Sequence, residues 1–318
     1  MTQEIRLSLA PIRGLTTASF RSLFCKHFAG FNSSIAPFIN PQKRASFDNK
    51  MLKDVLPEAN MVVPVIPQLL HNNAEDFIAL AGRLAELGYK EINWNLGCPA
   101  PMVAKKKRGS GMLAHPDLIV EFLEEVLPQI PVKLSIKTRL GYSNTAQTKE
   151  LLPRLDQFPL TEIIIHARLG KQMYKGTTDP DTFAECLQLS QHRIAYNGDI
   201  TTLEHFHELQ TRFPQVEHWM IGRGALADPF LAERIKGIGK LTPTQELLRL
   251  EKFHAELFEI YREELSGPSH IVGRMKMLWQ YLGASFPKQK KLLKKVHKAY
   301  NEEQFQESVS QLFQAERD

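Results

Sequence analysis

One cysteine of this chain stands in a sequence context that suits chemistry. Cys98 lies in the segment NLGCP (95–99), directly after an apolar run. The glycine before it and the proline after it favour a sharp, rigid turn. Cys25 and Cys186 lie far away and no CxxC pair occurs, which argues against a zinc site or a disulfide. Cys98 therefore either ends a strand as a small hydrophobe or presents its thiol to a substrate.

Other polar residues also stand at or near the ends of short apolar runs. Lys137 and Arg139 belong to one run, His166 and Arg168 to the next, and Gln68 ends an earlier one. Each has a structural alternative: Lys137 could extend its ammonium to solvent, His166 could be a core histidine, and Gln68 could cap a loop. Their repeated occurrence at the same end of successive runs favours one shared functional site.

Two glycine-containing segments indicate a phosphate site. The segments are NGD (197–199) and GRG (222–224), and each follows an apolar run. Glycine lets backbone N–H groups approach an anion closely, and Arg223 adds a fixed cation. Lys137 would suit a cofactor that becomes negative on reduction. Together these features suggest flavin mononucleotide (FMN).

The elements that must position these residues form a repeating pattern. Amphipathic stretches such as 74–88 and 115–127 stand between the apolar runs and show helical spacing. The pattern predicts an α/β fold, a (β/α)8 TIM barrel, in which strand ends and the loops after them carry the chemistry. A doubly wound sheet is the alternative, but no GxGxxG follows the first strand. The eight predicted strands are 6–11, 33–39, 61–69, 91–97, 132–140, 162–169, 193–200 and 218–226.

The strand pattern stops near residue 240. Residues 242–265 carry apolar residues at helical spacing, and further helices are expected around 269–282, 288–300 and 302–315. We therefore predict two domains, a catalytic barrel over 1–240 and a small helical domain over 241–318.

The helical part separates its charges. Residues 265–301 contain eight Lys or Arg and no Asp or Glu, beside Trp279 and Tyr281. A solvated basic face is the ordinary explanation for such a run. The length of this one, and the neighbouring flat side chains, favour a polyanion with unpaired bases. The candidate phosphate contacts are Arg274, Lys276 and some of the lysines from Lys288 to Lys298.

The totals agree with a soluble enzyme of this kind. The chain has 318 residues and a net charge of +5, with 43% hydrophobic and 24% charged residues. No signal peptide is recognisable and no apolar run reaches the ~18 residues of a membrane span. We expect a cytoplasmic, monomeric protein without a metal or a membrane partner.

Seven segments in order resemble the successive motifs of the tRNA-dihydrouridine synthases. The resemblance covers essentially the whole chain. In general architecture the chain is similar to the bacterial branch of the family that modifies uridine 16. The segments are LAPIRG (9–14), PQLL (67–70), NWNLGCPAPMVAKKKRGSGML (93–113), IKTRLG (136–141), IHARLGKQMYKG (165–176), NGDI (197–200) and IGRGAL (221–226).

The resemblance implies a flavin enzyme that reduces a uridine of tRNA to 5,6-dihydrouridine with NADPH. In that family the motif cysteine is a general acid, so Cys98 would protonate C5 of uracil after a hydride from FMN reaches C6. A thiol with an unperturbed pKa of ~8.5 is mostly protonated at neutral pH and can donate. The residues that would contact the RNA are Asn95, Arg139, Arg168, Arg274 and Lys276. The residues that would hold FMN are Ala10, Pro11, Ile12, Gln68, Lys137, His166, Asn197, Gly198, Asp199, Gly222 and Arg223.

The chain departs from the family pattern in several places. Ile12 replaces the usual Met, and the loop after Cys98 carries KKKR (105–108) where the family is often glycine-rich. Leu96, Ala100 and Ala167 differ as well. These departures bear on which RNA and which uridine is used. Two rival functions remain: an FMN-dependent TIM-barrel oxidoreductase acting on a free pyrimidine, and a non-catalytic RNA-binding paralogue.

Overall fold

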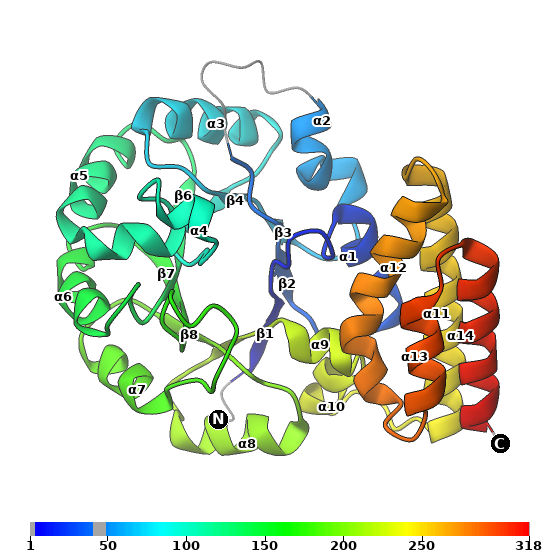
Figure 1. The fold of residues 1–318 in the computed structure, drawn as a ribbon. Coiled ribbons are helices and arrows are strands. Elements are labelled where there is room, and N and C mark those ends of the chain that lie inside the picture. The colour runs from blue at the N-terminus through cyan, green and yellow to red at the C-terminus, as the bar shows by residue number, and fades with distance from the viewer. Residues whose placement is uncertain (1–3, 41–48, 318) are drawn as a thin grey trace.

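Parallel strands form a nearly closed barrel in the computed structural model, which describes residues 4–40 and 49–317 (Figure 1). The nine strands of the described sheet follow the order β3-β2-β1-β9-β8-β7-β6-β5-β4. Helices surround them, so the predicted TIM barrel is confirmed. The strands are β1 (Arg6–Leu9), β2 (Ser33–Ile35), β3 (Val65–Ile66), β4 (Gln68–Leu69), β5 (Glu91–Asn95), β6 (Lys133–Arg139), β7 (Leu160–His166), β8 (Ile194–Asn197) and β9 (His218–Ile221).

The third predicted strand is divided in two at Pro67. Strand β3 pairs with β2, whereas β4 pairs with β5. Proline has no N–H for a ladder, but its carbonyl still accepts from the Asn93 N–H at 2.8 Å. The bend at Pro67 therefore joins the two ends of the sheet and closes the ring.

Amphipathic helices cover the outside of the barrel. In α3 the Asn73 side chain accepts a hydrogen bond from the Asp76 N–H, and Phe77, Leu80 and Leu84 are buried against the sheet. The short helix α4 (Pro101–Ala104) lies within the ring of the other helices (Figure 1). Those helices are α1 (Ala18–His27), α2 (Asn49–Leu52), α3 (Ala74–Glu86), α5 (Pro116–Val126), α6 (Ala146–Leu155), α7 (Pro180–Gln188), α8 (Leu203–Arg212), α9 (Arg223–Ala227) and α10 (Leu231–Lys236). Short 3₁₀ turns cover Lys53–Val55, Pro57–Ala59, Gly109–Ala114 and Gly283–Ser285.

A C-terminal group of helices packs against one side of the barrel (Figure 1). It consists of α11 (Pro243–Glu264), α12 (Pro268–Leu282), α13 (Lys290–Lys298) and α14 (Glu302–Arg317). Phe253 of α11 packs against Phe20, Phe24 and Phe28 at ring-centroid distances of 5.9, 5.8 and 5.1 Å. These contacts make the helical region and the barrel share one apolar core. The division at residues 240 and 241 stays a prediction.

The expectation that Trp279 offers a flat surface to bases is wrong. The Trp279 ring is fully buried, and its indole N–H donates to His254 Nε2 at 3.1 Å. Trp279 lies on the apolar face of α12 with Met275 and Leu278, and that face is the core of the helical region. Burial lowers the pKa of His254 to about 3, so this histidine is a neutral acceptor.

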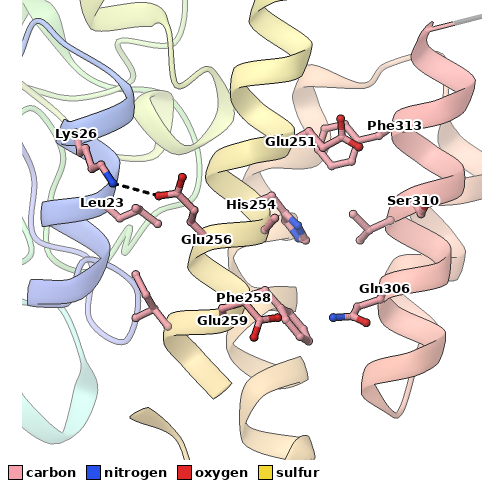
Figure 2. Close-up of a pocket in the computed structure, with 13 residues that line it drawn as sticks. Leu23, Lys26, Glu251, His254, Glu256, Phe258, Glu259, Gln306, Ser310 and Phe313 are labelled. Atoms are coloured by element: carbon pink, nitrogen blue, oxygen red, sulfur yellow. Dashed lines mark hydrogen bonds and ion pairs between the residues drawn. The ribbon is translucent and has the colours of Figure 1, made fainter. Parts of the chain in front are cut away.

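A pocket of about 610 Å³ lies between α1, α11 and α14 (Figure 2). His254, Phe258 and Phe313 line it, and an ion pair of 3.4 Å between Lys26 and Glu256 lies beside it. Its lining residues come from helices and not from the strand ends. The pocket is therefore separate from the predicted site.

Candidate active site at the strand ends

The side chain of Asn95 fixes the turn that carries Cys98 through hydrogen bonds to its backbone. Asn95 Oδ1 accepts hydrogen bonds from the N–H groups of Gly97 at 3.0 Å and Cys98 at 2.8 Å. From the other side, the Ser110 N–H and hydroxyl both donate to the Cys98 carbonyl at 3.0 Å. A Cβ on Gly109 would lie 2.7 Å from that carbonyl oxygen, so only glycine fits there. The turn is therefore fixed on both sides.

The Cys98 thiol is protonated at neutral pH. Burial raises its pKa, and a hydrogen bond from the Ala100 backbone together with the charges of Arg139, Arg13 and Lys137 opposes that rise only in part. A half-buried thiol of this kind is a poor nucleophile but a suitable proton donor.

A chain of buried amides links the Cys98 turn to the barrel interior. Asn95 Nδ2 donates to Gln68 Oε1 at 2.7 Å, and Gln68 Nε2 donates to Asn93 Oδ1 at 2.7 Å. Asn93 Nδ2 then donates to Ser135 Oγ at 3.0 Å, which donates to the Ile92 carbonyl at 3.3 Å.

The direction of this chain is determined at both ends by the backbone. N–H groups can only donate to Asn95, and the Ile92 carbonyl can only accept from Ser135. These two fixed ends determine the orientation of the amide groups of Asn95, Gln68 and Asn93. We call the side chains of Asn95, Gln68, Asn93 and Ser135 the amide relay.

Lys137 is a half-buried cation, and no carboxylate of residues 4–40 and 49–317 forms an ion pair with it. Its ammonium donates to Asn197 Oδ1 at 2.8 Å, and Asn197 Nδ2 donates to the Met220 carbonyl at 2.8 Å. Burial lowers the pKa of Lys137 to about 7, and the charge of Arg139 acts in the same direction. An anion placed beside this ammonium would relieve the cost of burying it.

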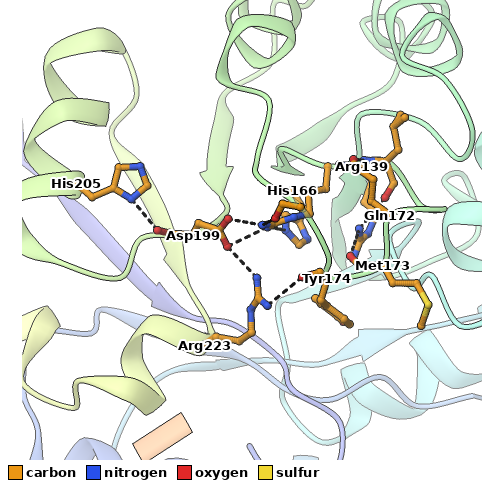
Figure 3. A network of polar contacts seen from close by, with 11 residues as sticks. Arg139, His166, Gln172, Met173, Tyr174, Asp199, His205 and Arg223 are labelled. Carbon is orange, nitrogen blue, oxygen red and sulfur yellow. Dashed lines mark hydrogen bonds and ion pairs between the residues drawn. The ribbon is translucent and has the colours of Figure 1, made fainter. Parts of the chain in front are cut away.

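Charged side chains that follow the carboxyl ends of β7, β8 and β9 form a network (Figure 3). Arg168 pairs with Asp199, and Arg223 Nη2 donates to the same carboxylate at 2.8 Å. Arg168 Nη1 lies 3.2 Å from His166 Nε2. Burial, together with the neighbouring cations, lowers the pKa of His166 well below its usual value. His166 is therefore neutral; since a guanidinium only donates, its Nε2 accepts and its proton is on Nδ1.

Arg139 donates hydrogen bonds to two loops, the one after β5 and the one after β7. Its Nε donates to the Gly97 carbonyl at 2.9 Å, and Nη1 donates to the carbonyls of Leu169 at 2.9 Å and Met173 at 2.7 Å. Arg139 and Arg223 lie over the Tyr174 ring at 5.3 and 5.4 Å from its centroid. Tyr174 is 54% exposed and so presents part of its ring at the barrel mouth.

Strand ends β1, β8 and β9 form a narrow cradle. A Cβ on Gly222 would lie 3.3 Å from the Ala10 Cβ and 3.9 Å from Ile12 Cδ1. Gly198 has φ of +148°, and a Cβ on Gly224 would lie 1.8 Å from the Ile200 carbonyl oxygen. Side chains are thus excluded where an anion could meet the backbone. Pro11 lies in the same loop, between Ala10 and Ile12.

This cradle and its cations fit the FMN that the sequence suggests. A phosphate requires glycine-lined backbone and a cation, which Gly198, Gly222 and Arg223 provide. A ring that becomes negative on reduction requires a cation, and Lys137 meets that requirement.

The two C-terminal candidates lie outside this cluster. Arg274 and Lys276 are half-buried on α12, and the Arg274 guanidinium lies 6.0 Å from the centre of the Tyr261 ring. Helix α12 still reaches the barrel, because a Cβ on Gly14 would lie 3.2 Å from Met277 Cε. The lysines of α13 are exposed.

The described residues contain neither a cluster of metal ligands nor a helix that could span a membrane. Within 4–40 and 49–317, no three His, Cys, Asp or Glu side chains are grouped so as to hold a metal ion. In the same residues, no helix has the length and apolar character that crossing a membrane requires.

Comparison with known sequences decides the family. The sequence model described as dihydrouridine synthase (Dus) matches residues 8–316. The chain belongs to the dihydrouridine synthase family. The predicted family and the predicted enzyme class are thereby confirmed.

Individual relatives of this Dus chain share about a quarter of its residues. It is 26% identical over 290 residues to the tRNA-dihydrouridine(16) synthase of Neisseria meningitidis serogroup B, covering 88% of this chain and 86% of the relative. It is 29% identical over 285 residues to tRNA-dihydrouridine synthase B of Proteus vulgaris, covering 86% and 85%.

Solved structures share the barrel. The old yellow enzyme homologue from Zymomonas mobilis superposes with a TM-score of 0.55 at 12% identity, covering 74% of this chain and 90% of that one. The old yellow enzyme from Trypanosoma cruzi gives 0.51 at 13% identity, covering 78% and 93%. At this identity the likeness concerns the fold.

Sequence reasoning missed three residues of this site. Asn93 and Ser135 belong to the amide relay, and Tyr174 lies between two arginines. A signal for Asn93 was present, because residues two apart on a strand face the same side and Asn95 faces inward. The same spacing marked Ser135, which lies two residues before Lys137 on β6, whereas no comparable signal marked Tyr174.

Proposed function

We propose that this Dus protein reduces a specific uridine of tRNA to 5,6-dihydrouridine, with FMN as cofactor and NADPH as reductant. The observation that carries the proposal is a protonated thiol, Cys98, on a rigid turn at the same barrel edge as Lys137, a half-buried cation that no carboxylate of the described residues pairs with. Acid and cation together suit the reduction of a neutral pyrimidine ring.

Cys98 is the proton donor in the proposed reaction. FMN, when bound, would supply the hydride that goes to C6 of uracil. The Cys98 thiol gives its proton to C5, which leaves a thiolate. Arg139 and Lys137 are the cations that stabilise this thiolate, since both lower the pKa of Cys98. Proton and hydride together saturate the C5–C6 bond.

The remaining residues bind and orient. Lys137, His166, Asn197 and Gln68 would face the flavin ring, whereas Gly198, Asp199, Gly222 and Arg223 would surround its phosphate. The loop of Ala10, Pro11 and Ile12 forms one wall of the cradle. Asn95 holds the Cys98 turn and would contact the uridine.

The RNA contacts are part of the same proposal. The guanidinium groups of Arg139 and Arg168 are buried below the barrel mouth, so they would act on the substrate indirectly. Arg139 holds the neighbouring loops, and Arg168 holds the Asp199 carboxylate. Arg274, Lys276 and the α13 lysines would contact phosphates outside the barrel. A target uridine must leave its stack to reach Cys98, which costs a few kcal/mol, and such backbone contacts would offset that cost.

The experiment is mass-spectrometric mapping of dihydrouridine in tRNA from cells with and without this gene. We expect one position, or a few, to lose the modification when the gene is absent. Purified protein should be yellow and should reduce that position in tRNA from the deleted strain. Protein that cannot be reconstituted with FMN, or that reduces only free pyrimidine, would contradict the proposal.

A further inference from the structure

A short basic segment lies directly beyond the Cys98 turn. Helix α4 begins at Pro101, two residues after the turn, and the chain then runs through Lys105, Lys106 and Lys107. All three lysines are exposed, and the Met102 side chain is 81% exposed. We call Met102, Lys105, Lys106 and Lys107 the lysine turn. In Figure 1, α4 lies within the ring of outer helices, whereas α12 and α13 lie to one side of it.

The lysine turn is held rigidly by the residue that follows it. Arg108 Nε donates to Asn72 Oδ1 at 2.8 Å and Nη1 to Asn40 Oδ1 at 3.1 Å, while Nη2 lies 2.8 Å from His71 Nε2. Asn72 Nδ2 donates in return to the Lys106 carbonyl at 3.1 Å. Arg108 is therefore a structural anchor, and the three lysines before it remain exposed.

The same segment is packed against the catalytic turn. A Cβ on Gly111 would lie 2.4 Å from the Ala104 carbonyl oxygen, and Ser110 donates to the Cys98 carbonyl. The lysines and Cys98 thus belong to one rigid unit. Whatever binds the lysines is placed at a fixed distance from the thiol.

The charge of this surface is not compensated locally. Residues 92–116 contain no Asp or Glu, and within 4–40 and 49–317 no carboxylate forms an ion pair with Lys105, Lys106 or Lys107. Many other cations of the chain, such as Lys26 and Lys149, do have carboxylate partners. An unpaired basic run beside an exposed apolar side chain suits a nucleic acid, because phosphates need cations and unstacked bases need apolar contacts.

We propose that the lysine turn binds the tRNA backbone beside the target uridine, with Met102 packing against the base left unstacked by its departure. This inference rests on the proposed function, since a tRNA uridine must approach Cys98. The RNA would then be held on two sides of the mouth, by the lysine turn and by the helical region. An acidic peptide has the charge but no reason to lie beside Cys98.

The test compares two double variants that remove the same charge. Lys105→Ala with Lys106→Ala changes the lysine turn. Lys90→Ala with Lys133→Ala changes two exposed lysines at the amino ends of β5 and β6, at the opposite end of the barrel. Binding of bulk tRNA from the deleted strain is measured against salt, and flavin reduction by NADPH is the control for folding.

The lysine-turn variant should bind tRNA more weakly, with a log–log salt slope reduced by roughly 0.7 to 0.9 unit per lost phosphate contact. The Lys90 and Lys133 variant should keep the slope of the unaltered protein, and both should keep normal flavin reduction. Met102→Ala should lower the single-turnover rate of dihydrouridine formation several-fold at saturating tRNA. Equal slopes in the two double variants would overturn the inference.

Failure of this inference and failure of the proposed function give different results. Normal dihydrouridine formation with an unchanged slope in the lysine-turn variant overturns the inference alone. Binding of tRNA that depends on Lys105 and Lys106, without dihydrouridine in any tRNA, overturns the proposed function alone. Loss of binding to an acidic peptide, with tRNA binding unchanged, would also overturn the inference.

Discussion

Breaking the amide relay should slow uridine reduction far more than flavin reduction. The change is Asn93→Leu, which removes the central link between Gln68 and Ser135. Gln68 Nε2 then loses its only described acceptor inside the barrel, while Ser135 can still donate to the Ile92 carbonyl. Asn95 keeps its hydrogen bonds to the Cys98 turn and to Gln68, but Gln68 is no longer fixed by Asn93.

The magnitude follows from the groups left unpaired. One buried donor without a partner costs about 1–3 kcal/mol of unfolding free energy. A displacement of the Cys98 thiol by ~1 Å can cost ~10²-fold in rate, because proton transfer to C5 depends on geometry. We expect uridine reduction by the reduced enzyme to fall by about 10- to 100-fold. Flavin reduction by NADPH should fall by no more than a few-fold, because Cys98 takes no part in it and only Gln68, among the side chains proposed to face the flavin ring, loses a contact.

Stopped-flow measurement of the two half-reactions and urea unfolding separate positioning from general destabilisation. Thr182→Val is the matched control, since its hydroxyl donates to Asp179 Oδ2 at 2.7 Å in the buried face of α7, away from Cys98. It should lose a similar unfolding free energy and keep both half-reactions. If Asn93→Leu is destabilised as expected but reduces uridine at the normal rate, the relay does not position Cys98.

Three further predictions follow from the same geometry. Cys98→Ala should keep flavin binding and NADPH oxidation but lose about 10²–10⁴-fold in dihydrouridine formation, and a loss of only a few-fold would exclude Cys98 as the acid. Because the Lys137 pKa is lowered to about 7, its charged form dominates below pH 7, so FMN affinity measured by fluorescence should fall as pH rises above 7. In Lys137→Met that pH dependence should disappear, and an unchanged profile would count against the contact. Replacing four α13 lysines with Ala should weaken tRNA binding and flatten its salt slope without altering flavin content; an unchanged slope would make them a solvated face. The four are Lys290, Lys291, Lys294 and Lys295.

The sequence by itself determined the architecture and predicted part of the candidate site. Strands and helices differ in the period of their apolar residues, so the alternation was readable along the chain. Parallel strands in a barrel end at one edge, and therefore Cys98, Lys137, His166 and Arg223 could be placed together without coordinates. The boundaries were close as well: residues 115–127 were predicted for α5, which covers Pro116–Val126.

Only the tertiary structure decided which groups are paired, buried or exposed. Asn93 meets Gln68 and Ser135 across 25 and 42 residues of sequence, and these contacts depend on the register of β4, β5 and β6. The burial that lowers the pKa of Lys137 likewise comes from neighbours on other strands.

The same reason explains the corrections. Tryptophan has an apolar ring and a polar N–H, so the residue type alone does not show whether Trp279 is buried. Only the packing of α12 against α11 and α14 shows that its ring faces inward. Pro67 divides a strand because the two ends of the sheet must meet there to close the barrel. Pattern and composition predict elements and their order, whereas hydrogen-bond partners, desolvation and side-chain direction arise when those elements pack.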